Sequence, residues 1–320
     1  MANKNFQNAK IAKEDEFYTK ITDIEKELKH YKEQFKDKVI FCNCDDPETS
    51  NFWKYFELQF DDLGIKKLVS THFDPEKPTY KLELMYDING DGKRTKKDII
   101  KTNLKQNGDF RSPESIEILK EADIVITNPP FSLFKEYLAQ LIEYDKKFLI
   151  IGSQNNITYK EIFPLIQQNK IWLGYNAGDM EFVVPDYYEP RETRYREENG
   201  IKYRSMGNIC WYSNLDVSKR YENITLYKVY SPAEYPTYDN YNAIECKRVD
   251  LIPVDYYDAI GVPITFLYKY NPNQFEIIGN SSTLAGAITD KETGKIKNNP
   301  QRFYLDGKRL FDRIVIRRKG

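Results

Sequence analysis

The sequence predicts an α/β fold: a doubly wound, mostly parallel sheet with an antiparallel edge hairpin, followed by a smaller β-rich C-terminal region. Short apolar runs of strand length at residues 38–43, 67–73, 124–127 and 147–152 alternate with amphipathic helical patterns. This alternation is typical of parallel sheets covered by helices. From about residue 216 the helical periodicity ends, and short aromatic and β-branched runs are separated by Pro, Gly and Asn.

The other elements can be placed in chain order. Apolar residues three and four positions apart between Ile21 and Phe35 indicate an amphipathic helix before the first strand. Residues 171–175 and 208–213 have the composition of antiparallel edge strands. The expected organisation is one large domain over residues 1–215, with a hairpin excursion at 79–105 and a polar loop at 180–205, and a second region over residues 216–320.

Composition limits the classes of protein that fit. The 320 residues are 40% apolar and 30% charged, an ordinary globular mix. No run approaches the ~20 apolar residues that a membrane helix needs, and the N-terminus lacks the apolar core of a signal peptide. Four scattered cysteines favour a reduced, cytoplasmic protein. The chain has only two histidines, so a His-rich metal site is not expected.

One segment imitates a calcium-binding loop. Asp87, Asn89, Asp91, Gly92 and Asp98 match most of that pattern. The last ligand, however, is Asp rather than Glu, basic residues fill the positions between, and predicted strands rather than helices flank the loop. We therefore expect no metal site.

The stretch ADIVITNPPFSLF, residues 122–134, is the most informative in the chain. Its apolar run indicates a buried parallel strand that ends at Thr127, because two prolines cannot continue a central strand. A helical pattern follows from Ser132. The motif Asn128-Pro129-Pro130-Phe131 therefore forms a rigid polar turn at the carboxyl end of a strand, where open α/β sheets place their ligands.

This turn offers groups that suit an aromatic amine. Pro130 restricts Pro129 to an extended conformation, so the Pro129 carbonyl is not used in a sheet ladder. Together with the side-chain oxygen of Asn128 it provides two acceptors for the two hydrogens of an exocyclic amino group. Phe131 provides an apolar face on which a planar base can stack. The alternative is a Pro-Pro loop that only caps a strand.

The motif NPPF at a strand end resembles the catalytic motif of amino-group methyltransferases that use S-adenosylmethionine. The segments DEFYT, VIFCNCDDPETSNF, GDFRSPES, ADIVITNPPFSLF, FLIIGSQNNITYKEIF and RIVIRRK together resemble the EcoRI-type adenine-specific DNA methyltransferases. This resemblance covers nearly the whole length. It implies a class I methyltransferase sheet, methyl transfer from S-adenosylmethionine to N6 of a flipped-out adenine in double-stranded DNA, and a catalytic domain followed by a target-recognition region at 216–320.

Candidate cofactor-binding residues lie near the predicted strand ends. Acidic residues after the first strand attract the cationic groups of S-adenosylmethionine by Coulombic complementarity, and a carboxylate after the second strand commonly binds ribose hydroxyls. The family resemblance adds the FYT segment and the GDF segment. The resulting set is Phe17, Tyr18, Asn43, Asp45, Asp74, Asp109, Phe110 and Asn128.

Each of these residues also has a purely structural interpretation. Phe17 and Tyr18 can pack the first helix onto the core, and Asp74 can be a turn residue before Pro75. The GDF segment can be a loop that leads into the helix after Ser112-Pro113. Asp46, next to Asp45, can be a helix cap, with Pro47 in the first turn.

A net charge of −1 does not by itself indicate a nucleic-acid binder, so the basic residues that contact DNA must be segregated. The candidates for contacts with phosphates or guanine edges are Arg191, Arg194, Arg196, Lys202 and Arg204, together with the region beyond residue 216. We expect a monomer that works without physical contact with a cognate restriction endonuclease.

Two other functions use the same residues. The first is an amino-group methyltransferase that acts on RNA or on a protein glutamine through the same turn. The second is a catalytically silent DNA-binding module in which the turn is only structural.

Overall fold

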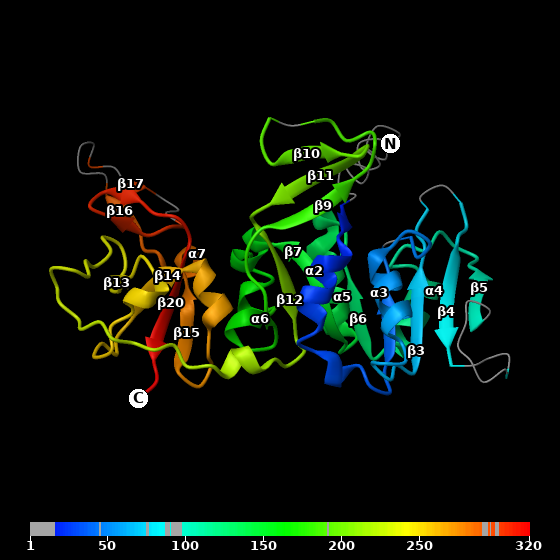
Figure 1. The fold of residues 1–320 in the computed structure, drawn as a ribbon. Coiled ribbons are helices and arrows are strands. Elements are labelled where there is room, and N and C mark those ends of the chain that lie inside the picture. Colours follow the sequence, from blue (N-terminus) through cyan, green and yellow to red (C-terminus); the bar gives the residue numbers. More distant parts are fainter. Residues whose placement is uncertain are drawn as a thin grey trace. The chain divides into compact units, whose positions relative to one another are not determined.

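The computed structural model describes residues 17–44, 46–74, 77–86, 90, 98–190, 192–289, 294, 296–297 and 301–320 (Figure 1). The chain divides into two compact units. The first comprises Met1–Gln154 and Leu173–Leu215, and the second comprises Asn155–Trp172 and Asp216–Gly320. The segment Asn155–Trp172 thus groups with the C-terminal region. Within the described residues, no helix is both long and apolar enough to span a bilayer.

An eight-stranded sheet with the order β5-β4-β3-β2-β6-β7-β12-β8 forms the core of the first unit. The strands are β2 (Val39–Cys42), β3 (Lys67–Thr71), β4 (Tyr80–Met85), β5 (Ile99–Asn103), β6 (Ile124–Thr127), β7 (Lys147–Ser153), β8 (Trp172–Leu173) and β12 (Ile209–Ser213). The four central strands, β3, β2, β6 and β7, are parallel. This confirms the prediction of a mixed α/β fold built on a large sheet with a parallel centre.

Antiparallel strands extend the sheet at both edges. β4 pairs antiparallel with β3 and with β5, so β4 and β5 are the two strands of the predicted hairpin. At the other edge β12 pairs antiparallel with β7 and lies beside β8. Most of the hairpin turn, including four of the five residues of the calcium-like pattern, lies outside the described residues. Asp98, the fifth, is fully buried.

The helices of the first unit are α2 (Ile21–Leu28), α3 (Asn51–Gln59), α4 (Pro113–Glu121) and α5 (Phe134–Glu143), with the 3₁₀ helices η1 (Lys32–Gln34) and η3 (Phe131–Leu133). α3 contacts β3, α4 contacts β2 and α5 contacts β7. The predicted first helix is shorter than its apolar stripe: the α-helix ends at Leu28, although Phe35 beyond it is fully buried. Ser112 caps α4 as predicted, by accepting a hydrogen bond from the Ser115 amide.

The alternative role of Asp46 as a helix cap is wrong. α3 begins at Asn51, and Ser50 caps it by accepting a hydrogen bond from the Phe52 amide. Asp46 instead caps a tight turn, in which its carboxylate accepts a hydrogen bond from the Glu48 amide. An Asp-Pro pair suits the start of a turn as well as the start of a helix, and the better-placed Ser50 begins the helix.

A second sheet in this unit replaces much of the predicted polar loop at 180–205. Its order is β1-β9-β11-β10, with β1 (Tyr18–Thr19), β9 (Met180–Val184), β10 (Tyr195–Glu198) and β11 (Ile201–Met206). The expectation of a loop here is wrong, because an Asn199-Gly200 turn with two positive φ angles, 52° and 76°, closes a hairpin. The sheet places β1, which directly follows Phe17, beside β9.

The second unit is rich in β-structure, as predicted. Its main sheet has the order β13-β14-β20-β15, formed by β13 (Ile244–Glu245), β14 (Ile260–Pro263), β15 (Phe275–Asn280) and β20 (Arg313–Arg318). Two small hairpins add β16 (Ile288–Thr289) with β17 (Ile296–Lys297), and β18 (Tyr304–Leu305) with β19 (Lys308–Arg309). The helices are η4 (Gln154–Thr158), which starts one residue before this unit, α6 (Phe163–Gln167), η5 (Ser218–Tyr221), η6 (Val249–Leu251), η7 (Ile264–Lys269) and α7 (Ser281–Leu284).

A buried carboxylate fixes α2 to the first unit. Glu27 is fully buried and accepts hydrogen bonds from the Tyr31 hydroxyl at 3.0 Å, the Tyr175 amide at 2.6 Å and the Asn176 amide at 2.9 Å. Burial raises the pKa of Glu27. These bonds hold the chain after β8 against α2. Removal of the carboxylate leaves one buried and several part-buried donors without this acceptor, which is costly.

We expect Glu27→Ala to lower the free energy of unfolding by about 2–4 kcal/mol, because the donors of Tyr31, Tyr175 and Asn176 lose their acceptor. Chemical denaturation followed by circular dichroism measures this change. Glu25→Ala, at an exposed position of the same helix, is the control and should leave stability within about 0.5 kcal/mol. Equal effects of the two substitutions would contradict the structural role of Glu27.

Candidate active site

The NPPF turn follows a fully buried strand. All four residues of β6 are buried, and the hydroxyl of Thr127 donates a hydrogen bond to the backbone carbonyl of Asn43, beyond the end of β2. Asn128 is 7% exposed, whereas Pro130 and Phe131 are half-buried. η3 and α5 continue directly from the turn. The motif therefore lies at the carboxyl end of a central parallel strand, as the sequence predicts, and part of it reaches solvent.

A contact with the backbone of Phe17 orients the amide of Asn128. Its Nδ2 donates a 2.6 Å hydrogen bond to the backbone carbonyl of Phe17. A carbonyl only accepts, so the nitrogen of the amide has to face it. The other end of the amide, Oδ1, is buried and has no hydrogen-bond partner among the described residues. A buried acceptor without a partner is costly, which marks this oxygen as a group that a donor from outside the chain can satisfy.

Aromatic rings surround the turn. The rings of Phe17 and Phe131 are stacked, with centroids 5.6 Å apart and an interplanar angle of 22°. Phe182 of β9 meets both rings edge-on, and Tyr188 meets Phe17 edge-on. Phe17 therefore contacts the motif twice, through its carbonyl and through its ring. Tyr18, the next residue, pairs with Val183 in the second sheet.

Asn43 and Phe110 meet at a third residue, Tyr137 of α5. The Tyr137 hydroxyl donates a hydrogen bond to Oδ1 of Asn43, and the Tyr137 ring packs edge-on against Phe110 at 5.0 Å. Burial raises the pKa of Tyr137, so its hydroxyl remains a donor. The loop after β2 is thus connected to the helix that follows the NPPF turn.

Asp74 and Asp109 lie close to each other at the end of β3. The Asp74 amide bonds to the carbonyl of Asn107, whose side chain accepts a hydrogen bond from the Asp109 amide. Gly108, between Asn107 and Asp109, has φ +75°, and a Cβ there would lie 1.9 Å from the carbonyl oxygen of His72. Only glycine allows this approach, so the GDF segment is held tightly against the end of the strand.

The carboxylate of Asp109 is paired with Arg111. Arg111 donates from Nε to Oδ1 at 2.9 Å and from Nη2 to Oδ2 at 2.7 Å, and a third bond joins it to Glu136. Desolvation raises the pKa of Asp109, but the hydrogen bonds and the charge of Arg111 outweigh it, so the pKa is lowered. Asp109 is therefore an anion with a fixed orientation, and part of its acceptor capacity is already in use.

Four candidate DNA-binding residues lie on the β10–β11 hairpin or directly before it: Arg194, Arg196, Lys202 and Arg204. Arg196 forms two 2.8 Å bonds with Glu181 of β9. Lys202 donates to the carbonyls of Asp186 and Tyr188. Arg204 donates to a carbonyl of the preceding loop. These cations hold the hairpin together.

The backbone of Arg194 has φ +58°, and its Nη1 lies 3.7 Å from Oδ2 of Asp179. Two other predicted site residues, Asp45 and Arg191, lie outside the described residues.

The structure thus brings Phe17, Asn128 and Phe131 together, Asn43 and Phe110 together, and Asp74 and Asp109 together. The sequence did not identify the residues that connect them, in particular Tyr137, Phe182 and Arg111. Tyr137 follows the helical apolar pattern, so nothing in the sequence marks its hydroxyl as functional. Arg111 lies only two residues after Asp109, so an opposite charge close to this carboxylate could be read from the sequence.

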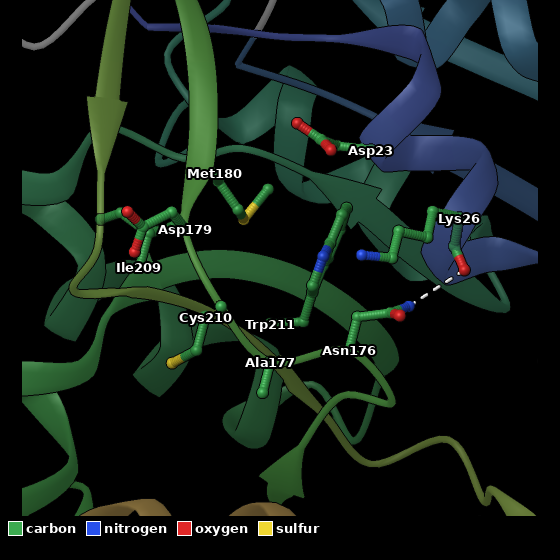
Figure 2. A pocket seen from close by; sticks show the side chains of 10 residues that line it. Asp23, Lys26, Asn176, Ala177, Asp179, Met180, Ile209, Cys210 and Trp211 are labelled. Carbon is green, nitrogen blue, oxygen red and sulfur yellow. Dashed lines mark hydrogen bonds between the residues drawn. The ribbon is translucent and has the colours of Figure 1, made fainter. Parts of the chain in front are cut away.

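A small cavity in the first unit is separate from this site. It is lined by residues of α2, the segment 176–180 and β12, including Asp23, Lys26, Asn176 and Trp211 (Figure 2). Its volume of about 20 Å³ has room for a water molecule, not for a nucleoside. Among the described residues, no cluster of His, Cys, Asp and Glu can hold a metal ion.

A parallel sheet with NPPF at the end of a central strand defines the class of amino-group methyltransferases. The family model described as adenine-specific methyltransferase EcoRI matches residues 5–319. The chain belongs to this family, and it is an adenine-specific DNA methyltransferase, as the sequence predicts.

Three relatives agree with this assignment. Type II methyltransferase M.EcoRI from Escherichia coli is 49% identical over 289 residues, which cover 86% of this chain and 89% of that protein. A type II methyltransferase from Mycoplasma genitalium is 36% identical, with 98% of this chain and 99% of that protein covered. A third, from Mycoplasma pneumoniae, is 37% identical, with 98% of each covered. No solved structure matches the chain.

The contact between Arg196 and Glu181 predicts a pH dependence. The hydrogen bonds from Arg196 lower the pKa of Glu181 from its ordinary 4.5 to about 2. A carboxyl with a lowered pKa stabilises the folded state above its unfolded-state pKa, and this contribution declines as the pH falls toward the folded-state pKa. The contribution of Glu181 to the free energy of unfolding is therefore fully present above about pH 4.5 and declines toward pH 2.

The measurement is the free energy of unfolding of the protein and of Glu181→Gln between these pH values. We expect the difference between the two proteins to be largest above about pH 4.5 and to shrink toward pH 2. Glu197→Gln, on β10 of the same sheet, is the control and should show a smaller difference. A difference between the protein and Glu181→Gln that does not change with pH would refute the assigned contact.

Proposed function

We propose that this enzyme transfers a methyl group from S-adenosylmethionine to N6 of an adenine that is flipped out of double-stranded DNA at a specific site. The observation that carries the proposal is the unpaired, buried Oδ1 of Asn128 at the end of β6. This oxygen is fixed in orientation and has no donor among the described residues, and an adenine amino group is a donor of suitable chemistry.

The second acceptor is the carbonyl of Pro129. No donor among the described residues pairs with it. When both hydrogens of the amino group are held by these two oxygens, the nitrogen lone pair is directed away from them instead of being delocalised into the ring. The lone pair then points toward the methyl donor, an effect of orientation. The ammonium formed on transfer is very acidic, so loss of its proton to solvent needs no strong base.

An adenine reaches this turn only after leaving the duplex, which costs a few kcal/mol. Stacking on an aromatic ring is worth roughly 1–3 kcal/mol per base and offsets part of this cost. Phe17 covers one face of Phe131, so we assign the opposite face of Phe131 to the base. Phe182 holds both rings edge-on and limits their movement.

S-adenosylmethionine supplies an electrophilic methyl group on a cationic sulfur. The residues at the ends of β2, β3 and β6 fit such a group, because Asp74 and Asp109 are acidic and Phe110 offers an aromatic edge beside them. We assign the cofactor to Phe17, Tyr18, Asn43, Asp74, Asp109, Phe110 and Asn128, and we include Asp45 from its position in the sequence. Arg111 acts on Asp109 by fixing the orientation of its carboxylate. A sheet of the class I methyltransferase type is part of this proposal.

The partner is duplex DNA, and the type II designation of the relatives supports a role in restriction–modification. We propose that the first unit performs the chemistry and that residues 216–320 read the target sequence. Arg191, Arg194, Arg196, Lys202 and Arg204 provide positive charge for phosphates. We further propose a cytoplasmic monomer that needs no contact with an endonuclease. The family assignment to adenine disfavours RNA and protein glutamine as substrates, and it disfavours a silent DNA-binding module.

Asn128→Ala removes the orienting acceptor without removing the cofactor contacts at the ends of β2 and β3. We expect the rate of methyl transfer to fall by at least about 100-fold, with the dissociation constant for S-adenosylmethionine changed by less than about threefold. Incorporation of labelled methyl into DNA and titration calorimetry measure the two quantities. Asn103→Ala, at an exposed position of β5, is the control. Wild-type turnover in Asn128→Ala would refute the assigned role.

Expression of the protein in cells that lack other adenine methylation tests the reaction itself. We expect N6-methyladenine at one short sequence throughout the genome, absent with Asn128→Ala. Single-molecule sequencing maps the modified positions. Labelled methyl incorporated into RNA or protein, with none in DNA, would overturn the proposal.

A further inference from the structure

Phe311 is the most exposed of the large hydrophobic side chains in the described part of the chain, at 89% of its surface. It lies in the second unit, between β19 and β20. A single exposed apolar residue is common on protein surfaces and by itself indicates nothing. Its surroundings are informative because the residues on both sides of it are held in place and two exposed basic residues precede it in the sequence.

The backbone on both sides of Phe311 is fixed. Leu310 packs against the buried cluster that contains Tyr238 and Phe303, and its amide bonds to the Phe303 carbonyl at 2.9 Å. On the other side Asp312 forms a 2.8 Å ion pair with Arg302. The neighbours of Phe311 thus face inward and are held, so the ring points outward from a rigid base.

The preceding hairpin, β18–β19, is equally well held. Asp239 accepts hydrogen bonds from the turn amides of Asp306 and Gly307, at 3.2 and 2.7 Å. The side chains of Lys308 and Arg309 are exposed, and neither has an ion-pair or hydrogen-bond partner within the described residues. The two charges next to Phe311 are therefore available for an external anion.

The charge of the whole segment supports this interpretation. Residues 301–320 contain seven basic and two acidic side chains, although the full chain has a net charge of −1. Basic residues are therefore concentrated in this segment, as a protein of low net charge requires if it binds a polyanion. The surface combines unpaired cations with a protruding apolar ring, and duplex DNA presents phosphates beside base steps into which such rings insert.

We propose that Phe311 inserts between base steps of the DNA as an apolar wedge, while Lys308 and Arg309 contact the flanking phosphates. This inference rests on the proposed function, since it takes duplex DNA as the substrate. The inference adds a contact between the second unit and DNA away from the adenine that is methylated. The cations provide salt-dependent attraction, and the ring provides a contact that releases no counterions.

The experiment measures binding of a duplex that contains the methylated sequence mapped above, by fluorescence anisotropy at several salt concentrations. We expect Phe311→Ala to bind about 10-fold more weakly at every salt concentration, with an unchanged slope of log Kd against log salt. Phe311→Trp should restore most of the affinity. Substitution of both Lys308 and Arg309 by Gln should reduce the slope by about 0.9 for each phosphate that the protein no longer neutralises.

Leu58→Ala removes another exposed apolar side chain, 69% exposed on α3, and should bind DNA normally. Wild-type affinity of Phe311→Ala would overturn the inference, as would a native dimer that this substitution dissociates in sedimentation. Failure of the proposed function is separate, because it would appear as the absence of N6-methyladenine in DNA with the unaltered protein, whatever the affinities.

Discussion

The hydrogen bond from Asn128 to the carbonyl of Phe17 determines what the site can do. An amide side chain has a donor end and an acceptor end of nearly equal size, and either can point into an active site. The Phe17 carbonyl only accepts, so it fixes the donor end and leaves Oδ1 without a partner in the part of the chain that the structure describes. The N-terminal segment therefore takes part in forming the acceptor, although it lies 111 residues away in the chain.

The remaining contacts surround this bond. Tyr137 joins Asn43 to the helix after the motif, and Gly108 lets the Asp109 loop approach the end of β3. Each contact joins the loop after one parallel strand to a neighbouring helix or loop. As a result, the candidate residues for cofactor and substrate belong to one connected structure at the carboxyl ends of the parallel strands, where open α/β sheets bind their ligands.

Much of this arrangement could be predicted from the sequence. The buried strand, the double proline and the apolar helix after it determine where Asn128 lies, because each is a strong local signal. The long-range contacts could not be predicted. Nothing near Phe17 in the sequence indicates that its carbonyl meets Asn128. The strands beside Asn199-Gly200 carry mostly polar residues, a composition that favours a loop. The Asp46-Pro47 pair is ambiguous, because a turn and a helix start with the same two residues.

The carboxylate of Glu181 links two segments of the first unit. This one carboxylate binds Lys20 at 2.9 Å and Arg196 at 2.8 Å. Lys20 belongs to the segment that carries Phe17, and Arg196 belongs to the β10–β11 hairpin. Displacement of the hairpin by a bound polyanion that competes for Arg196 would therefore also weaken the restraint on the segment that orients the Asn128 amide. The segment that carries Phe17 and the β10–β11 hairpin would then both be less restrained.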